Sequence, residues 1–517
     1  MAKSSALTVD WPFKFHSMKK YDHIVVGAGI SGLTLTLLLS LQNKKVLLLE
    51  KGPHIGGSLI RFYKKNIPFD TGFHFTAGFS KGGILTDMLA VLGIGQQIKP
   101  IFLSESGSGV FVFEKDNLIF DVSAGIDNFR LSLHKYFPQE TIAIDTYFAK
   151  VKKVWQSTPS LDLRTIGVSG QAIDEDYLSL QEVLDSLTTN NHLKGLLSAF
   201  CVCYGVGPKE TSFANHARIA GGLYESVARI ENGGEAFIRA FNQRFQQSNI
   251  EVRCNTTISE CADIQHDTVG KFILSSGESV EAGDCTFTIH PQEVLKILPR
   301  QYFKKAFLER VAAFETSYGF FCVSGIVENA DPTTFGPSIA SLLPSTDLND
   351  LLSPAQKQET ALAIIRCVET GKDGKRYCTV NAFGPEFYPH LKQWADSTVG
   401  KRPADYYAYK TQRTKRVVER FYALYPQYQD NFKVLDAASI LTFRDYLFSP
   451  EGNAYGIKQK MGQFNLFGKL PLLNIYVAGQ SAVLPGIVGA MVSSFIVARN
   501  LIGKEKFNQF IEGALCN

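Results

Sequence analysis

The sequence predicts an α/β fold in which a Rossmann-like domain with a parallel sheet is joined to an α+β domain with an antiparallel sheet. Residues 23–50 alternate strand, glycine-rich turn, helix and strand, which is typical of a parallel sheet covered by helices. A second glycine-rich turn and helix follow at residues 474–501, so we expect the first domain to be discontinuous. Between them, two apolar runs flank Lys-Asp-Gly-Lys at residues 372–375, which predicts a hairpin of the antiparallel sheet.

The first glycine-rich turn predicts a dinucleotide-binding site. Ile24–Val26 is a short apolar run suited to a buried strand, and Gly27, Gly29 and Gly32 follow it as G-x-G-x-x-G. The first glycine permits a tight turn, the second lets the backbone approach a pyrophosphate, and the third lets the helix lie close to the strand. We expect a helix over residues 30–41 that directs its N-terminal N–H groups at the phosphates.

The acidic residue after the second strand indicates how the ribose is held. Val46–Leu49 is the second buried strand, and Glu50 ends it, 18 residues after Gly32. A carboxylate at this position accepts hydrogen bonds from both hydroxyls of an adenosine ribose and disfavours the 2′-phosphate of NADP.

The C-terminal segment predicts a second part of the same site. Residues 474–478 form a short apolar strand, Gly479-Gln480 a turn, and Pro485–Ala490 opens a helix that runs to about Leu501. A helix N-terminus stabilises an anion, so this helix is suited to a cofactor that becomes negatively charged on reduction.

Four segments resemble one known family. Lys51–Ser58 reads Lys-Gly-Pro-His-Ile-Gly-Gly-Ser and resembles the extended fingerprint of the flavoprotein amine oxidase and phytoene desaturase superfamily. Asp70–Phe75 resembles the Asp-x-Gly-x-His-aromatic segment of retinol saturases and carotenoid isomerases, and Glu451–Gly456 resembles the Gly-x-x-Tyr-Gly element of that group. Residues 475–490 resemble its closing motif. The chain is therefore identified as similar to the phytoene desaturase, carotenoid isomerase and retinol saturase group; Gln480, where amine oxidases carry an acid, favours this side of the superfamily.

The resemblance implies FAD as the cofactor, with the second glycine-rich turn along its pyrophosphate and the last helix facing the flavin. Ser58 departs from the family, since many relatives carry arginine there, and Arg61 is considered as its replacement near the phosphates. We expect no metal, because the ten histidines show no metal-ligand spacing. The residues expected to bind the cofactor are Gly27, Ala28, Gly29, Ile30, Ser31, Gly32, Glu50, Lys51, Gly56, Gly57, Ser58, Gly72, His74, Ile258, Gly479, Gln480, Gly486, Ile487, Val488 and Ala490.

The expected division of the chain follows from these motifs. The FAD-binding domain is predicted at 21–100, 215–295 and 470–505, the middle piece because Asn232-Gly233-Gly234 and residues 250–258, read as a strand, resemble the family's mid-chain return. The substrate-binding domain is predicted at 101–214 and 296–469, and residues 1–20 form an N-terminal extension.

A substrate cavity with aromatic walls is expected in the second domain. Aromatic residues make up 12% of the chain, and clusters at Phe73/Phe75/Phe79 and Phe320/Phe321 lie in segments that the resemblance places near flavin or substrate. An ordinary large core explains a single phenylalanine as well, so a long apolar tunnel remains one of two interpretations.

Three residues are candidate catalytic groups: His74, Tyr455 and Glu451. His74 follows Gly72 on the segment that enters the flavin pocket, where it either donates a proton, bonds the flavin, or is a buried histidine that shapes the loop. Tyr455 and Glu451 either reach the cavity or are a turn tyrosine and an exposed acid. Asp70 is expected to cap a turn.

These observations predict an FAD-dependent oxidoreductase or isomerase that acts on carbon–carbon double bonds of a hydrophobic polyene, isoprenoid or acyl chain. Desaturation, saturation and cis/trans isomerisation all remain open. One alternative is a flavoprotein oxidase of a small polar substrate such as an amine. Another is a non-catalytic FAD-bound partner in a biosynthetic complex.

Composition bounds the location and the partners. The net charge is +4 with no basic block, which disfavours nucleic-acid binding. Nine scattered cysteines indicate reduced thiols and a cytoplasmic protein. We read no signal peptide and no transmembrane helix. A poorly soluble substrate would come from a membrane surface or a carrier protein, so we expect peripheral membrane association through an apolar, partly basic mouth of the cavity.

Overall fold

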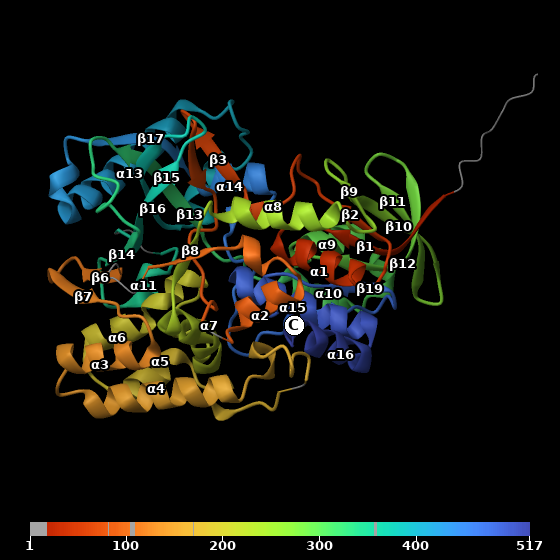
Figure 1. Cartoon of the computed structure of the whole chain (residues 1–517), viewed down its shortest axis with the longest axis horizontal. Helices are drawn as coiled ribbons and strands as arrows, with labels where there is room; N and C mark the ends of the chain where they lie inside the picture. Colours follow the sequence, from red (N-terminus) through yellow and green to blue (C-terminus); the bar gives the residue numbers. More distant parts are fainter. Residues whose placement is uncertain (1–17, 81, 104–108, 169, 356–358, 517) are drawn as a thin grey trace, which may run out of the picture.

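The structure is a computed structural model that describes residues 18–80, 82–103, 109–168, 170–355 and 359–516. Most of the predicted N-terminal extension therefore lies outside the described residues. Figure 1 shows three bodies of secondary structure: a sheet with helices on both faces, a second sheet, and a bundle of helices. Residues of all three line one central space. The expected fold class is confirmed.

The first sheet collects strands from distant parts of the chain. Its order is β10 (Ile258–Gln265), β11 (Thr268–Leu274), β12 (Ser279–Phe287), β1 (Lys19–Val26), β2 (Val46–Leu49) and β9 (Ile250–Arg253), with β19 (Ile475–Val477) beside β12 and β18 (Gly468–Lys469) beside β19. The β9–β2–β1–β12–β19 pairings are parallel, and β10–β11–β12 is an antiparallel meander. Residues 250–258, expected as one strand, are two, because residues 254–257 turn at Asn255 with φ 51°.

Helices cover both faces of this sheet, which explains why its strands are continuous apolar runs. One face carries α1 (Ile30–Ser40), α2 (Ile84–Val91), α8 (Gly234–Phe245), α15 (Gly486–Ile502) and α16 (Lys504–Leu515). The other carries α9 (Pro291–Ile297) and α10 (Lys305–Ala312). Helices α1 and α15 pack together, and the hydroxyl oxygens of Ser31 and Ser494 lie 2.6 Å apart between them.

The second sheet is largely antiparallel. Its order is β17 (Phe432–Ala438), β13 (Gly319–Val327), β16 (Arg376–Glu386), β15 (Leu362–Thr370), β14 (Ser338–Leu343), β6 (Gly109–Phe113) and β7 (Leu118–Asp121). The predicted hairpin is β15–β16, closed at Thr370 and Arg376. The long helix α13 (Ala404–Leu424) packs on one face, and the opposite face is turned toward the central space.

The helical bundle and short elements complete the walls. The bundle contains α3 (Ile126–Tyr136), α4 (Thr141–Gln156), α5 (Leu180–Leu187), α6 (Asn191–Ser198) and α7 (Phe213–Glu225). The short elements are the hairpin β3 (Arg61–Lys64) and β4 (Ile67–Asp70), the pair β5 (Pro100–Phe102) and β8 (Ala228–Ile230), and the helices α11 (Leu348–Leu351), α12 (Tyr388–Leu391) and α14 (Ile440–Leu447).

Packing moves two of the expected domain boundaries. Helix α7 was expected to begin the middle piece of the dinucleotide-binding domain, but its buried residues join the core of the helical bundle. Residues 296–314 were expected in the substrate domain, but Leu298, Val311 and Phe314 pack with the core of the first sheet. Both segments are amphipathic, so the sequence pattern alone did not indicate which core each one covers.

Candidate functional site

One cavity of about 1300 Å³ connects the two sheets. At one end it is lined by the turns after β1, β2 and β19, which lie at the carboxyl edge of the parallel strands. At the other end it is lined by the free face of the second sheet and by helix α14. Ligands of open α/β sheets bind at the carboxyl edge of the strands, so the position of this cavity is that of a cofactor and substrate site.

The first glycine turn has the shape that a dinucleotide requires. Gly27 has φ 99°, and a Cβ on Gly32 would lie 1.8 Å from the Gly27 carbonyl oxygen, so both positions need glycine. At Gly29 a Cβ would meet no described atom within 4 Å. Gly29 lines the cavity, so this open space is where a phosphate can approach the backbone.

Glu50 is held beside this turn by backbone hydrogen bonds. Its carboxylate accepts one from the Ala28 N–H at 2.8 Å and one from the Gly52 N–H at 2.7 Å, and its side chain lines the cavity. The second glycine turn closes on the first, because a Cβ on Gly57 would lie 3.2 Å from Gly29 Cα. The chain therefore offers a fixed carboxylate and two backbone turns to one ligand.

The C-terminal turn reaches the same cavity from the other end of the chain. Gly479 has φ 117° and donates its N–H to the Ser493 Oγ at 2.8 Å, which ties the turn to α15. Helix α15 has Pro485 as its N-cap and no side-chain cap, and Gly486, Ile487 and Val488 line the cavity. The first N–H groups of this helix are free to face a ligand with negative charge.

These features fit a flavin dinucleotide, because an elongated groove of backbone turns leads from a ribose-type carboxylate to an uncapped helix N-terminus. Of the residues expected to bind it, all but Ala28, Gly32 and Gly56 line the cavity. Those three act through the backbone: Ala28 orients Glu50, Gly32 packs α1 onto the turn, and a Cβ on Gly56 would lie 2.4 Å from Ile238 Cδ1. The contacts of each residue with a cofactor remain predictions.

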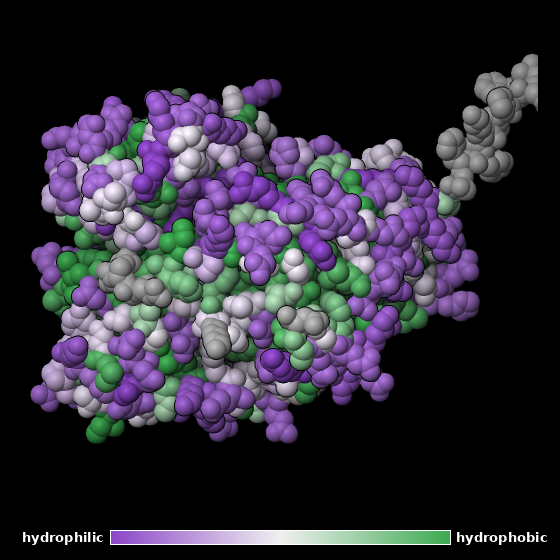
Figure 2. Space-filling view, viewed as in Figure 1, coloured by the Kyte–Doolittle hydropathy of each residue, from purple (hydrophilic) through white to green (hydrophobic). Residues whose placement is uncertain are grey.

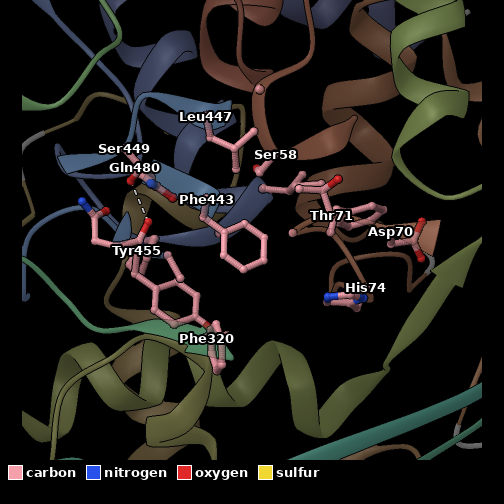
Figure 3. A pocket seen from close by; sticks show the side chains of 18 of the residues that line it. Ser58, Asp70, Thr71, His74, Phe320, Phe443, Leu447, Ser449, Tyr455 and Gln480 are labelled. Carbon is pink, nitrogen blue, oxygen red and sulfur yellow. Dashed lines mark hydrogen bonds between the residues drawn. The ribbon is translucent and has the colours of Figure 1, made fainter. Parts of the chain in front are cut away.

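The far end of the cavity is an aromatic chamber (Figure 3). The ring of Phe320 lies edge-on to Tyr455 and Phe383, with centroids 5.9 and 5.4 Å away, and His74 stacks on Phe383 at 4.3 Å. Phe73 and Phe75 line the cavity as expected. Phe321 instead points to the other face of β13, where it is buried near α13, and Phe79 is not part of the cavity wall.

His74 is neutral at physiological pH. The pKa of its imidazole is lowered to about 4: burial is the largest cause, Asp70 opposes it, and the Arg229 and Arg61 cations add to the lowering. Its Nδ1 is buried and has no hydrogen-bond partner among the described residues. The ring lines the cavity wall, so the neutral imidazole is a candidate hydrogen-bonding group there, but it is not protonated to act as an acid near neutral pH.

Two residues near His74 differ from their expected roles. Asp70 does not cap a turn, and Arg61 does not line the cavity near the phosphate end. Both belong to a closed ring of four buried charges: Asp70 contacts Arg61 at 2.9 Å and Arg229 at 3.0 Å, and Glu369 contacts the same arginines at 2.8 and 2.9 Å. The expectations failed because Arg229 and Glu369 come from distant strands and were not singled out.

The other two catalytic candidates separate. Tyr455 lies in the chamber wall and donates its hydroxyl hydrogen bond to the Val202 carbonyl at 3.3 Å; burial holds its pKa well above the usual value. Glu451 is exposed, accepts a hydrogen bond from the Thr316 hydroxyl, and does not line the cavity. Glu451 therefore has no contact with the cavity, although its neighbours Pro450 and Gly452 line it.

The cavity opens through a mouth that combines apolar and basic side chains. Val399, Tyr407, Tyr446 and Phe448 line the cavity and also rank among the exposed large hydrophobic residues, with exposures of 47, 46, 64 and 39%. We call Val399, Tyr407, Tyr446 and Phe448 the rim. Lys51 lies over the Phe448 ring at 4.8 Å. Figure 2 shows that elsewhere on the viewed face hydrophilic side chains dominate, apart from a hydrophobic band between the sheet and helical bodies.

Other features concern metals, thiols and membranes. In the described part of the chain no three His, Cys, Asp or Glu residues cluster as a metal site. The nine cysteines are free thiols. Among the helices described, none has the length and apolarity needed to cross a membrane.

Sequence reasoning missed several wall residues, including Asn381, Phe383, Ser324 and Val202. Sheet pairing rather than short spacing brings Ser324, Asn381 and Phe383 to the cavity: Ser324 and Asn381 are 57 residues apart but face each other across β13 and β16. Val202 comes instead from the short helix Ala199–Cys203. The available signal was the two-residue period of a strand, which puts Ser324 on the same face as Phe320 and Asn381 on the same face as Phe383.

The comparisons with known proteins agree with this geometry. The model of the NAD(P)-binding Rossmann-like domain matches residues 25–92. An all-trans-retinol 13,14-reductase of Danio rerio is 25% identical over 93% of this chain and 86% of its own length. Prolycopene isomerase 2 of an Oncidium hybrid cultivar is 31% identical over 30% of this chain and 26% of its own length.

Two solved structures share the fold. An oxidoreductase from Methanosarcina mazei has a TM-score of 0.66 at 15% identity and covers 92% of this chain and 99% of its own. Cyclohexylamine oxidase from Brevibacterium oxydans IH-35A has a TM-score of 0.58 at 16% identity and covers 93% of this chain and 100% of its own.

Proposed function

Because this chain belongs to the phytoene desaturase, carotenoid isomerase and retinol saturase group, we propose that it is an FAD-dependent oxidoreductase acting on carbon–carbon double bonds of a hydrophobic polyene. The observation that carries the proposal is the continuity of one cavity. The cofactor cradle and the aromatic chamber share it, with no described element between them. FAD supplies hydride transfer at the flavin N5 when bound.

The side chains of the chamber suit a flat apolar chain. Phe320, Phe383 and Tyr455 present ring faces and edges, and Cys322 and Ile339 line the adjoining sheet surface. These groups exclude water and restrict the orientation of a conjugated chain through its flat faces. The pKa of His74 is lowered and that of Tyr455 is raised, so both side chains are uncharged near neutral pH and can form hydrogen bonds as neutral groups.

The cofactor half of the proposal is tested by flavin content. Purified protein is expected to carry one non-covalent FAD that denaturation releases. Gly29→Val places a side chain in the open space of the first turn, and Glu50→Arg removes the ribose acceptor, so each should abolish FAD binding. Glu281→Arg, which alters an exposed carboxylate of β12 away from the cavity, is the matched control. Near wild-type flavin in the Gly29 and Glu50 variants would refute the site.

The substrate half is tested by anaerobic spectroscopy of the FAD-bound protein. The reduced protein is mixed with all-trans-retinol or with a cis-polyene, and flavin oxidation and product isomers are followed. We expect a change in a double bond of the polyene. In a parallel experiment the oxidised protein is mixed with small amines; reduction of its flavin by an amine, together with no reaction of any polyene, would favour the amine oxidase alternative.

We also propose that substrate enters through the rim from a membrane surface. The four rim residues are apolar or aromatic, and Lys51, Lys64 and Lys410 line the same cavity. Apolar insertion together with basic side chains is the combination by which peripheral proteins bind anionic bilayers. A carrier protein that delivers the chain is the alternative source.

A further inference from the structure

The floor of the aromatic chamber contains a polar pair that the proposed function does not use. Side chains of one sheet face alternate along each strand, so Phe320, Cys322 and Ser324 of β13 face the cavity, as do Asn381 and Phe383 of β16. Ser324 and Asn381 are directly opposite each other in the β13–β16 register. Phe320, Cys322 and Phe383, which lie beside them on this floor, are apolar, so the primary amide at its centre requires an explanation.

Asn381 has hydrogen-bond donors left over. Its Oδ1 accepts a hydrogen bond from the Ser324 Oγ at 2.9 Å, which orients the amide. Asn381 is 4% exposed and Ser324 3%, so both are buried. Within the described residues nothing accepts a hydrogen bond from the Asn381 Nδ2, which carries two N–H groups and lies in the cavity wall. Because Asn381 lines the cavity, a ligand bound there can accept a hydrogen bond from these N–H groups.

Charged residues adjoin the polar pair on the side of strand β17. Asp436 of β17 is opposite Ser324 on the other side, and its carboxylate is paired with Lys64 at 3.2 Å. Lys410 also lines this part of the cavity, is flanked by Asp436 and Lys64, and has no ion-pair partner among the described residues. Hydrogen-bond donors therefore predominate at this end of the chamber, which favours a ligand with an acceptor atom.

The distance from the polar pair to the aromatic rings suits a ligand that has an oxygen at one end and an apolar chain along the rest of its length. Ser324 follows Phe320 by four residues along β13, which corresponds to about 13 Å of strand. A ligand whose oxygen lies at Asn381 would then place its chain along Cys322 and Phe320, toward Tyr455 and the cofactor cradle.

We propose that Asn381 determines specificity by donating a hydrogen bond to an oxygen atom at one end of the substrate. The substrate is then an oxygenated chain, an alcohol, a carbonyl compound or a carboxylate, rather than a pure hydrocarbon. This inference rests on the proposed function, which requires a polyene in the chamber.

The test compares ligands that differ only in the oxygen. FAD-loaded protein is titrated with all-trans-retinol, with all-trans-retinoic acid and with the hydrocarbon of the same carbon skeleton, and binding is followed by the absorption shift of the polyene. We expect an oxygenated ligand to bind about tenfold more tightly than the hydrocarbon, as one well-placed hydrogen bond in a dry site allows. In Asn381→Leu this preference should vanish while hydrocarbon binding is retained.

Three further variants distinguish the Asn381 hydrogen bond from other effects of substitution. Cys322→Ala alters the same floor without changing hydrogen bonding, so it should change all affinities by one common factor. If Asn381→Leu does not fold, Asn381→Asp keeps the shape and removes the amide donors. Lys410→Met separates the two oxygen chemistries, since it should weaken retinoic acid alone if the group is a carboxylate.

Two results would overturn the inference. A hydrocarbon that binds wild type as tightly as the oxygenated ligands removes the preference altogether, and a preference that survives in Asn381→Leu assigns it to other residues. Failure of every polyene to bind FAD-loaded protein would instead refute the proposed function, and this inference with it.

Discussion

Arg229 and Glu369 meet at 2.9 Å, and this contact joins β8 to β15 across 140 residues of sequence. With Arg61 and Asp70 they complete a ring of two cations and two anions, and each of their side chains is at most 11% exposed. The ring ties the β3–β4 hairpin to the second sheet, and Arg229 also donates a hydrogen bond to the His74 carbonyl at 3.3 Å. It thus fixes the segment that carries His74.

We predict that Glu369→Gln destabilises the protein by about 3–5 kcal/mol, because it leaves an uncompensated buried cation. Chemical denaturation of the FAD-loaded protein measures this. The matched control is Glu281→Gln, whose partner Lys20 lies 4.0 Å away at the surface and whose loss should cost less than about 1 kcal/mol. Equal effects of the two substitutions would mean that the ring does not stabilise the fold.

Much of the cofactor half of the site was predictable from sequence, because its residues act within short, glycine-marked segments. Gly27, Gly29, Gly32 and Glu50 lie where their spacing placed them, and β2 has the predicted bounds, Val46–Leu49. The C-terminal turn at Gly479 reaches the same cavity, as the family resemblance implied.

The substrate half of the site was harder to predict from the sequence, because strand pairing brings together residues that are far apart in the chain. Asn381 faces Ser324 only once β13 and β16 are paired. Asp70 was expected to cap a turn, but Arg61 of β3 and Arg229 of β8 are its partners, and the pairing with Arg229 spans 159 residues. Glu451 shows the opposite error: its motif adjoins the site, but Glu451 itself is exposed and does not line the cavity.

We predict that His74→Ala lowers turnover far more than FAD occupancy. The imidazole stacks on Phe383 and lines the chamber wall, so its loss removes a polar aromatic ring from the surface that faces the substrate. Turnover and bound flavin are measured on the same preparations, with His74→Gln as the variant that retains a hydrogen-bonding side chain. Unchanged turnover in correctly folded His74→Ala would leave His74 a structural residue only.

We predict that the stability of the protein falls as the pH drops below about 6.5. Burial lowers the pKa of His216 to about 3, from 6.5, so the unfolded chain binds a proton before the folded chain does. His216 therefore contributes its full stabilisation above pH 6.5 and loses about 1.4 kcal/mol per pH unit below it, until about pH 3. His23 and His74 act in the same direction.

Unfolding free energies between pH 7.5 and 5 test this dependence. His216→Gln removes one titrating group, so its curve should be lower at pH 7.5, where the bonds to Tyr204 and Tyr147 are lost, but flatter toward acid. The exposed His266 gives a matched control, since His266→Gln should leave the slope unchanged. A slope in His216→Gln as steep as in wild type would contradict the assignment.

We predict that the rim binds anionic membranes and that salt weakens this binding. Tyr446 and Phe448 are exposed while lining the cavity, so they can enter the outer part of a bilayer and bring the mouth to a poorly soluble substrate.

FAD-loaded protein should float with vesicles that contain phosphatidylserine at low salt, and less at high salt, because screening weakens attraction between lysines and lipid headgroups. The double substitution Tyr446→Ser/Phe448→Ser should abolish flotation but not FAD binding. Tyr177 is 72% exposed but lies outside the cavity wall, so Tyr177→Ser should float like wild type. If wild-type protein stays in the bottom fraction and converts dispersed substrate without lipid or detergent, delivery by a carrier protein replaces the membrane route.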